Sequence, residues 1–226
     1  MMTMMNESDF QLSSYDYELP EERIAQYPPK ERGASRLMVL DRESGRNIHS
    51  TFSHLPDFLP EGALLVANNS CVVPARLFGH RPSGGKVELL LLTPPPLLKA
   101  CATEENGWKK APAEVLLRPS RNIRTGDRLH FDDCIEAEVV EKKDFGRHDV
   151  VLFWKGDLVE CMKRIGRLPL PPYIKREQSG EDIARYQTVY ADREKSGSVA
   201  APTAGLHFTE DMRERLARQG IGWAEV

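Results

Sequence analysis

The sequence has little of what metal centres, disulfide scaffolds and membrane spans require. Its four cysteines lie far apart and form no CxxC pair, so neither a disulfide framework nor a metal-ligand spacing is indicated. No run reaches the roughly 18 apolar residues that a membrane span requires. Residues 1–9 also lack the basic flank of a secretory signal. We therefore expect a cytoplasmic protein that binds no metal and contacts no membrane.

The chain also lacks an excess of positive charge. Its formal net charge is −3, so no overall basic field indicates nucleic-acid binding, although this balance does not exclude a local basic patch. The basic side chains that suit such a patch are Arg118, Arg121, Arg124 and Arg128, with smaller clusters at Lys109-Lys110 and Lys175-Arg176. The same side chains fit ordinary solvated loops equally well.

What is present is the composition of a globular protein with a β-rich middle. Of the 226 residues, 40% are hydrophobic and 29% charged, which suffices for one large domain or two modest ones with a real core. Short strand-like runs separated by turn signals occupy residues 86–92, 113–118, 128–131, 135–141 and 149–154. Frequent short strands with almost no helical periodicity predict a small β-barrel.

The segments on either side of this middle mix helices and strands. Helices are predicted at residues 20–26, 157–166 and 210–219, a hairpin at residues 36–52, and strands at residues 63–67 and 221–226. The fold class that follows is α/β, a mixed α/β sheet domain with an inserted small β-barrel domain. We assign residues 1–76 and 155–226 to the α/β domain and residues 77–154 to the barrel.

The most informative segment is residues 198–209, a run of small residues that ends in a histidine and a helix cap. Thr209 is suited to cap the helix that follows. Ala204 and Gly205 let a ligand approach the backbone closely, and the imidazole of His207 can transfer protons at neutral pH. A turn of the chain with a structural histidine explains the same pattern, since spacing alone fixes no partner for His207.

Two further pairs of segments accompany this one in order along the chain. The first pair is Ser-Arg-Leu-Met-Val-Leu-Asp at residues 35–41 and Asn-Asn-Ser-Cys-Val-Val-Pro-Ala-Arg-Leu at residues 68–77. The second is Leu-Pro-Leu-Pro-Pro-Tyr-Ile at residues 168–174 and Arg-Tyr-Gln-Thr-Val-Tyr-Ala at residues 185–191. With residues 198–209, they resemble the S-adenosylmethionine:tRNA ribosyltransferase-isomerase family of queuosine biosynthesis.

The resemblance implies the same plan of a mixed domain with an inserted barrel, and a specific reaction. The ribosyl part of S-adenosylmethionine is transferred to 7-aminomethyl-7-deazaguanine in the tRNA anticodon loop and isomerised, giving epoxyqueuosine and releasing adenine and methionine. S-adenosylmethionine is then a consumed substrate, no cofactor or metal is implied, and we expect a monomer. Such a route needs a base near the C5′ protons and an acid that assists adenine departure.

Several residues of these segments are candidates for that site. His207 is the first candidate for acid–base work, and Thr203 suits either orientation of a ribose or carboxylate or capping of the backbone. Arg36 and Arg76 suit the methionine carboxylate, a tRNA phosphate or a structural ion pair. Further candidates for binding substrate are Tyr186, Gln187 and Tyr190, the tyrosines by stacking on a base or, alternatively, as packed side chains whose hydroxyls bond to backbone.

The chain departs from the family pattern at two places. Family members have Asn-Asp-Thr-Arg where this chain has Asn68-Asn69-Ser70-Cys71, so an acid and a base are missing together. This fits the loss of a salt-bridged pair as well as the loss of a ligand contact. Family members also continue beyond residue 226, so we expect the α/β domain to be incomplete at its carboxyl end. A non-catalytic tRNA-binding remnant or an inactive fragment is the alternative function.

Overall fold

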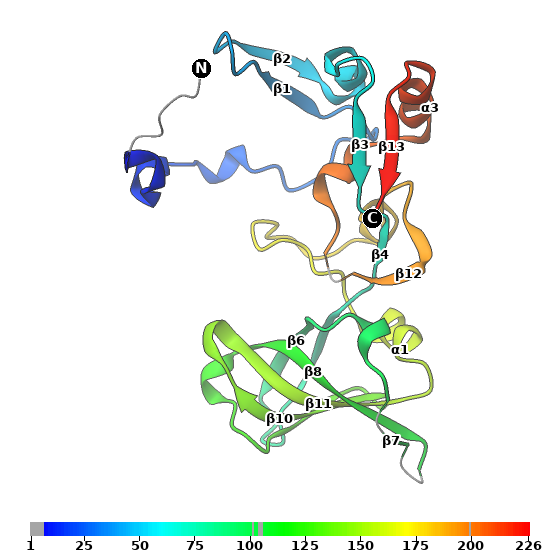
Figure 1. The fold of residues 1–226 in the computed structure, drawn as a ribbon. Coiled ribbons are helices and arrows are strands. Elements are labelled where there is room, and N and C mark those ends of the chain that lie inside the picture. Colours follow the sequence, from blue (N-terminus) through cyan, green and yellow to red (C-terminus); the bar gives the residue numbers. More distant parts are fainter. Residues whose placement is uncertain (1–6, 101, 104–105, 199) are drawn as a thin grey trace.

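A closed β-barrel and a region of mixed helices and strands lie one above the other (Figure 1). The computed structural model describes residues 7–100, 102–103, 106–198 and 200–226. In this part of the chain, no helix has the length and apolar character needed to cross a membrane. The mixed fold with a barrel, expected from the sequence, is confirmed.

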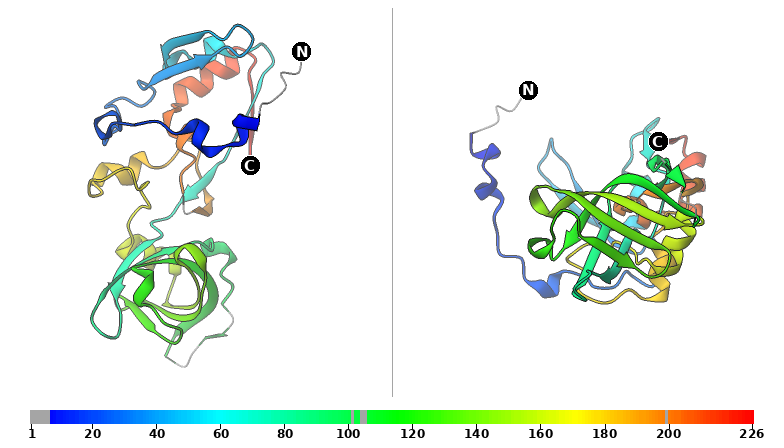
Figure 2. Two further views of the ribbon diagram at one scale, coloured as in Figure 1. Left: turned by 90° about the vertical axis from the view of Figure 1, so that its left-hand side faces the viewer. Right: turned by 90° about the horizontal axis from the view of Figure 1, so that it is seen from below.

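The barrel is a closed ring of six strands within a seven-stranded sheet. The strand order is β11-β10-β9-β5-β6-β8-β7, and pairing of β11 with β8 completes the ring, which is seen along its axis in Figure 2, left. The strands of the sheet are β5 (Arg76–His80), β6 (Lys86–Leu91), β7 (Ala102–Thr103), β8 (Trp108–Arg118), β9 (Arg128–Phe131), β10 (Ile135–Lys142) and β11 (Arg147–Lys155). All neighbours are antiparallel. Closure removes free strand edges from the ring.

Alternation of side chains fills the barrel with one continuous core. Along β10, Ile135, Ala137 and Val139 are buried, whereas Glu136 and Glu138 are partly exposed; this is the alternation that the sequence predicts. β8 is longer than the predicted strand at residues 113–118, because its first half pairs with β11 across Pro112.

Helix α1 (Leu158–Ile165) closes one end of the barrel. Leu158 and Met162 belong to the same hydrophobic cluster as the barrel strands. The side chain of Asp157 accepts a hydrogen bond from the Glu160 amide at 2.9 Å, so this helix has the predicted cap. The division into two domains with the boundaries given above stays a prediction.

The mixed region, meaning the described residues outside β5–β11 and α1, contains three two-stranded sheets. β1 (Arg36–Leu40) and β2 (Asn47–Thr51) form the predicted hairpin, β3 (Leu64–Ala67) pairs in parallel with β13 (Gly222–Glu225), and β4 (Ser70–Val72) pairs in parallel with β12 (Asp192–Ser198).

One α-helix and a set of aromatic residues form the core beside the β3–β13 pair. Helix α3 (Glu210–Arg218) begins after Thr209, whose hydroxyl accepts a hydrogen bond from the Met212 amide at 3.1 Å. Its buried side chains, Met212 and Leu216, pack with Ile221. The cap predicted at Thr209 is therefore present.

Short helical turns make up much of the rest. They are η1 (Glu7–Phe10), η2 (Leu12–Tyr15), η3 (Glu21–Arg23), η4 (Phe52–Phe58), η5 (Pro95–Leu97), η6 (Ser120–Asn122), η7 (Asp144–Gly146) and η8 (Thr203–His207), all of the 3-10 type. The helix predicted at residues 20–26 is wrong: only the single turn η3 forms there. Beyond that turn, the side chain of Gln26 bonds to the backbone of Tyr173 and Lys175 instead.

Helix α2 (Gly180–Arg185) and strands β4, β5, β7 and β12 are not among the elements predicted from the sequence. Helix α2 is only six residues long, too short for a helical period to be recognised. A capping box was its available signal, because Ser179 and Asp182 satisfy each other's backbone amides. β12 reads Asp-Arg-Glu-Lys-Ser-Gly-Ser, a sequence with no strand propensity of its own.

Candidate functional site

A cavity of about 340 Å³ lies where four segments of the mixed region meet. Residues 25–35, the segment 170–176, helix α2 with Tyr186, and η8 contribute its walls. Three of the candidates from the sequence, Tyr186, Thr203 and His207, line it together. The cavity is therefore the place where the predicted acid–base group has room for a ligand.

His207 ends η8 and is partly buried in this cavity. Its ring lies against Phe52, with ring centroids 5.0 Å apart and planes tilted by 36°. Burial, and then the nearby positive charge of Arg32, lower the pKa of His207 below its usual value. The imidazole is therefore neutral at pH 7 and is able to accept a proton.

Arg32 is a site residue that the sequence analysis missed. Its guanidinium donates hydrogen bonds to the carbonyl oxygens of Gln187, Leu206 and Arg185 at 3.1, 3.0 and 3.1 Å. Burial and the charge of Arg185 lower the pKa of Arg32, and the three acceptors of its guanidinium are neutral carbonyls. Arg32 thereby joins the end of α2 to η8 and places a positive charge beside His207.

Two glycines near η8 are required for different reasons, backbone conformation at Gly33 and side-chain packing at Gly205. Gly33 has φ +87°, which side-chain-bearing residues rarely adopt, and an added Cβ would lie 3.5 Å from the His207 carbonyl oxygen. An added Cβ at Gly205 would collide with the Tyr190 hydroxyl. The glycine at position 205, singled out in the sequence for ligand approach, is thus required by packing against Tyr190.

The cavity lining also contains a largely buried ion pair. Arg176 donates to both carboxylate oxygens of Asp182, at 2.6 and 2.7 Å, and its guanidinium lies 4.5 Å from the centroid of the Tyr27 ring. The hydrogen bonds from Arg176, with those from Ser179, lower the pKa of Asp182 to about 2. This pair joins the segment 173–176 to α2.

Tyr186 and Thr203 complete the candidates inside the cavity. Tyr186 is partly buried, its hydroxyl donates to the Pro169 carbonyl at 3.5 Å, and burial raises the pKa of its phenol. Thr203 is exposed at the start of η8. Tyr186 thus offers a neutral hydroxyl and an aromatic face at pH 7, and Thr203 offers an accessible hydroxyl.

Gln187 and Tyr190 lie outside the cavity. The amide of Gln187 bonds to both backbone groups of Val72, at 3.0 and 2.7 Å, as a backbone segment would. Tyr190 is buried against Trp223, with ring centroids 5.0 Å apart, and against Phe208. The structure therefore shows packing and backbone contacts for both, and their substrate roles stay predictions.

Arg36, Arg76 and Ala204 are also absent from the described cavity lining. Arg36 is exposed at the start of β1, and Ala204 is exposed on η8. Arg76 forms an ion pair with Glu88 at 3.2 Å and donates to the Leu170 carbonyl at 3.3 Å. Arg76 thus connects the barrel to the segment that lines the cavity.

Asn69, where the family pattern has an acid, lies at the carboxyl ends of β3 and β13. It is 2% exposed, and its amide donates to Glu225 at 2.9 Å and accepts from Lys195 at 3.2 Å. Glu225 also accepts from the Trp223 indole at 3.0 Å. These hydrogen bonds, that of Asn69 first, lower the pKa of Glu225. Asn69 is a neutral partner of a carboxylate, a role that an aspartate cannot fill at neutral pH.

Among the described residues, a group of possible metal ligands occurs at the turn between β9 and β10. Ligand atoms of Asp132, Asp133 and Cys134 lie within 4.8 Å of one another. Arg164 donates to Asp133 at 2.7 Å and lies 3.8 Å from Asp132, so both exposed carboxylates already have a cationic partner. We therefore assign no metal site to these residues.

Comparison with known proteins places the chain in a family. The family described as "Queuosine biosynthesis protein" matches residues 12–226. The S-adenosylmethionine:tRNA ribosyltransferase-isomerase of Nitratidesulfovibrio vulgaris (strain DP4) is 60% identical over 225 residues, which cover 97% of this chain and 61% of the relative. The enzyme of the same name from Oleidesulfovibrio alaskensis is 56% identical, over 96% of this chain and 57% of the relative.

A solved structure is similar in sequence over nearly the whole chain. The S-adenosylmethionine tRNA ribosyltransferase of Thermotoga maritima shares 31% identity with this chain and covers 93% of it, with 56% of its own length aligned and a TM-score of 0.34. The present chain thus spans about 60% of the length of the curated relatives that it matches. On the family match and these identities, the chain belongs to the queuosine biosynthesis protein family.

Proposed function

We propose that this chain contributes the cavity around His207 to an S-adenosylmethionine:tRNA ribosyltransferase-isomerase. The reaction transfers the ribosyl moiety of S-adenosylmethionine to 7-aminomethyl-7-deazaguanine in the tRNA anticodon loop and isomerises it to epoxyqueuosine, with release of adenine and methionine. The observation that carries the proposal is the partly buried imidazole of His207 in the cavity wall, in a chain 60% identical to relatives of that name.

His207 is assigned the proton-accepting step. The C5′ protons of S-adenosylmethionine are acidified by the adjacent sulfonium, and a base within hydrogen-bond reach can remove one of them. A protonated histidine cannot do this. Burial and the charge of Arg32 keep the pKa of His207 low, so the basic form predominates at neutral pH.

Tyr186 and Thr203 are assigned to binding. The aromatic ring of Tyr186 offers a stacking surface for adenine or the deazaguanine, and the exposed hydroxyl of Thr203 suits a ribose hydroxyl or a carboxylate. S-adenosylmethionine is consumed in this scheme. The partner is the anticodon loop of a tRNA that already contains the deazaguanine.

The test is release of adenine from S-adenosylmethionine, measured by liquid chromatography. The chain is assayed alone and together with the remaining carboxyl-terminal segment of the Nitratidesulfovibrio vulgaris relative, with and without tRNA carrying the deazaguanine. We expect adenine only with that tRNA, and its loss in His207→Ala. The matched control is His49→Ala, on the exposed hairpin strand β2.

Two outcomes would contradict the proposal. Full adenine release by His207→Ala would remove the acid–base assignment. Salt-sensitive tRNA binding without adenine release in any combination would support the alternative, a non-catalytic tRNA-binding protein.

A further inference from the structure

A groove of about 540 Å³ runs over the outer face of the barrel, outside the cavity of His207. It crosses β5, β6 and the end of β8, where neighbouring strands place Phe78 opposite Glu88 and His80 opposite Lys86. Its described lining residues, which define the barrel groove, are Phe78, Gly79, His80, Lys86, Val87, Glu88, Arg118, Pro119 and Arg167. A second hollow, lined in part by Arg81, Arg121 and Arg124, adjoins the groove, because Arg81 directly follows His80 in the chain. Arg81 donates to the Asn122 carbonyl at 3.1 Å.

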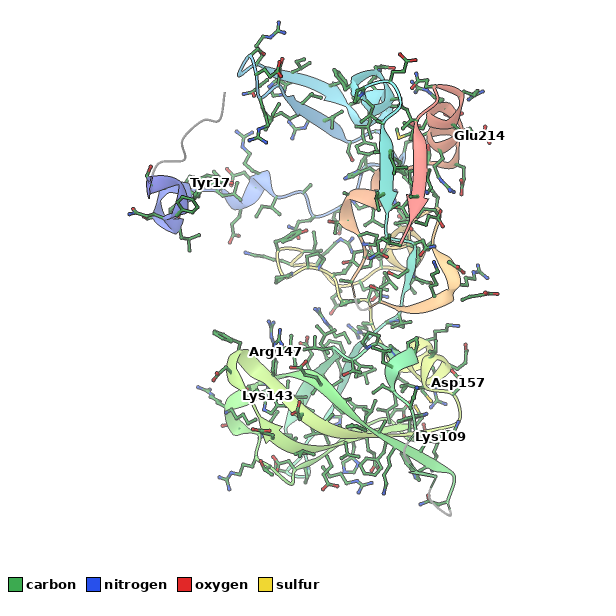
Figure 3. The ribbon with its side chains drawn as sticks, viewed as in Figure 1. Tyr17, Lys109, Lys143, Arg147, Asp157 and Glu214 are labelled. Atoms are coloured by element: carbon green, nitrogen blue, oxygen red, sulfur yellow. The ribbon has the colours of Figure 1, made fainter. Side chains whose placement is uncertain are left out.

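The charge in the barrel groove is positive and largely unneutralised. Glu88, the carboxylate among the described groove residues, forms an ion pair with Arg76 at 3.2 Å. In the described part of the chain, no ion pair involves Lys86 or Arg118 of the groove, although Glu88 lies opposite Arg118 across the β6–β8 ladder, and none involves Arg121 of the adjoining hollow. Other barrel cations differ: Lys143 and Arg147, labelled in Figure 3, pair with Asp149 and Glu114. Unpaired cations in a hollow attract phosphates.

The groove also contains a planar stacking surface. Phe78 is 50% exposed on β5, and the guanidinium of Arg167 lies 5.1 Å from its ring centroid. An arginine supported by an aromatic ring presents a flat cationic face, on which unpaired nucleic-acid bases stack. Bases in a duplex cannot use such a face, so the surface favours a single strand.

The barrel groove lies next to the cavity along the chain. Arg167 lines the groove and Leu170 lines the cavity, and three residues span at most about 11 Å. The backbone of Arg167 is bonded to that of Arg76 in β5, at 3.2 and 2.8 Å, so this segment is fixed to the barrel. In Figure 1 the segment that follows α1 leads from the barrel to the mixed region.

We propose that the barrel groove binds an unpaired stretch of RNA, with phosphates on its free cations and a base on the Arg167–Phe78 stack. The inference rests on the proposed function, since the RNA is then the loop of the tRNA whose modified base enters the cavity. It assigns anchoring of the RNA to the barrel and chemistry to the mixed region.

The experiment measures binding of a fluorescein-labelled anticodon stem-loop by anisotropy, at several salt concentrations. Lys86→Gln with Arg118→Gln removes two groove cations; Arg42→Gln with Arg218→Gln removes two exposed cations elsewhere. We expect the groove variant to weaken binding about 10-fold or more and to lower the salt slope by about 1.4, and the control to change affinity less than about 2-fold.

A second variant separates stacking from charge. Phe78→Leu keeps an apolar side chain and every cation, and we expect it to weaken stem-loop binding about 5-fold or more, with no change for a blunt duplex of the same stem. Circular dichroism confirms that each variant is folded.

Three results would overturn the inference: no binding of the stem-loop by the unmodified chain, equal weakening in the groove and control variants, or equal affinity of the stem-loop and the duplex. Its failure is distinguishable from failure of the proposed function. If adenine is released but the groove variant binds the stem-loop as tightly as the parent chain, only the proposal for the groove is rejected. If RNA binding depends on the groove but no adenine is released, only the catalytic proposal is rejected.

Discussion

The barrel and the mixed region are stabilised by different kinds of contact. The barrel has one continuous apolar cluster, to which every strand of the closed ring contributes buried side chains. In the mixed region the apolar clusters are small, and segments far apart in sequence are joined by arginine and amide side chains bonded to backbone carbonyls. The barrel therefore has one large apolar core, whereas the cavity depends on a few polar residues.

Removing a barrel side chain is expected to give the largest loss of stability. Leu89 is completely buried in the barrel core, so Leu89→Ala leaves a cavity and should lower the free energy of unfolding by about 2–5 kcal/mol. Leu40→Ala, at a position 62% exposed on β1, is the control and should cost little. Urea unfolding measures both. Equal losses would show that the barrel core is not the main source of stability.

The ion pair in the cavity wall should give the next largest effect. The pKa of Asp182 is lowered to about 2 in the folded protein, so the carboxylate contributes stability above its unfolded pKa, near 4. This contribution, about 2 kcal/mol, is lost as the pH falls from about 4 to about 2.

Asp182→Asn should therefore lower stability at pH 7 and make unfolding less dependent on pH between about 4 and 2. Asp211→Asn, on the exposed side of α3, is the control. Urea unfolding at a series of pH values provides the measurement. An unchanged pH dependence in Asp182→Asn would contradict the assigned role of the pair.

Restoring the family's acid at position 69 should give a smaller, pH-dependent effect. Asn69→Asp places a carboxylate against Glu225, which the Asn69 amide contacts at 2.9 Å. Repulsion raises the folded-state pKa of this pair above its unfolded value, so the variant loses stability relative to the parent as the pH rises through the pKa. We expect a loss of about 1–2 kcal/mol at pH 7, reduced at pH 4.

Asn68→Asp is the matched control, because Asn68 is exposed and uses its side-chain oxygen to accept from Ser70, which a carboxylate does equally well. Thermal unfolding at pH 4 and pH 7 compares the two variants. If Asn69→Asp is more stable than the parent, the expected repulsion is wrong, and Lys195 and Arg213 compensate for the second carboxylate.

The smallest expected effect is on the protonation of His207. Arg32→Gln removes a positive charge that lowers the pKa of His207, so this pKa should rise towards its ordinary value. Burial is the larger cause and persists, so the rise is partial. An NMR titration of the imidazole measures it, with Arg46→Gln on the exposed hairpin as control. An unchanged or lowered pKa in Arg32→Gln would contradict the electrostatic role of Arg32.

Much of the barrel was predictable, because its strands follow from a short-range pattern. The alternation at residues 135–141 and the Gly and Asp turns are properties of neighbouring residues. The cavity was predictable only in part: Thr203, Tyr186 and His207 were found, but Arg32 was not. No residue pattern marks Arg32, since its partners are backbone carbonyls, which are present at every position of a chain.

The sequence by itself determined five strands of the barrel, β6 and β8–β11, the caps at Asp157 and Thr209, and the motifs that indicate the family. The tertiary structure alone decided which side chains share the cavity, that Gln187 is bonded to Val72, and that Asn69 meets Glu225. The physical reason is how far apart in the sequence the interacting residues lie. Strand alternation and helix caps depend on residues a few positions apart, whereas these contacts join segments more than 100 residues apart and form only when the chain is folded.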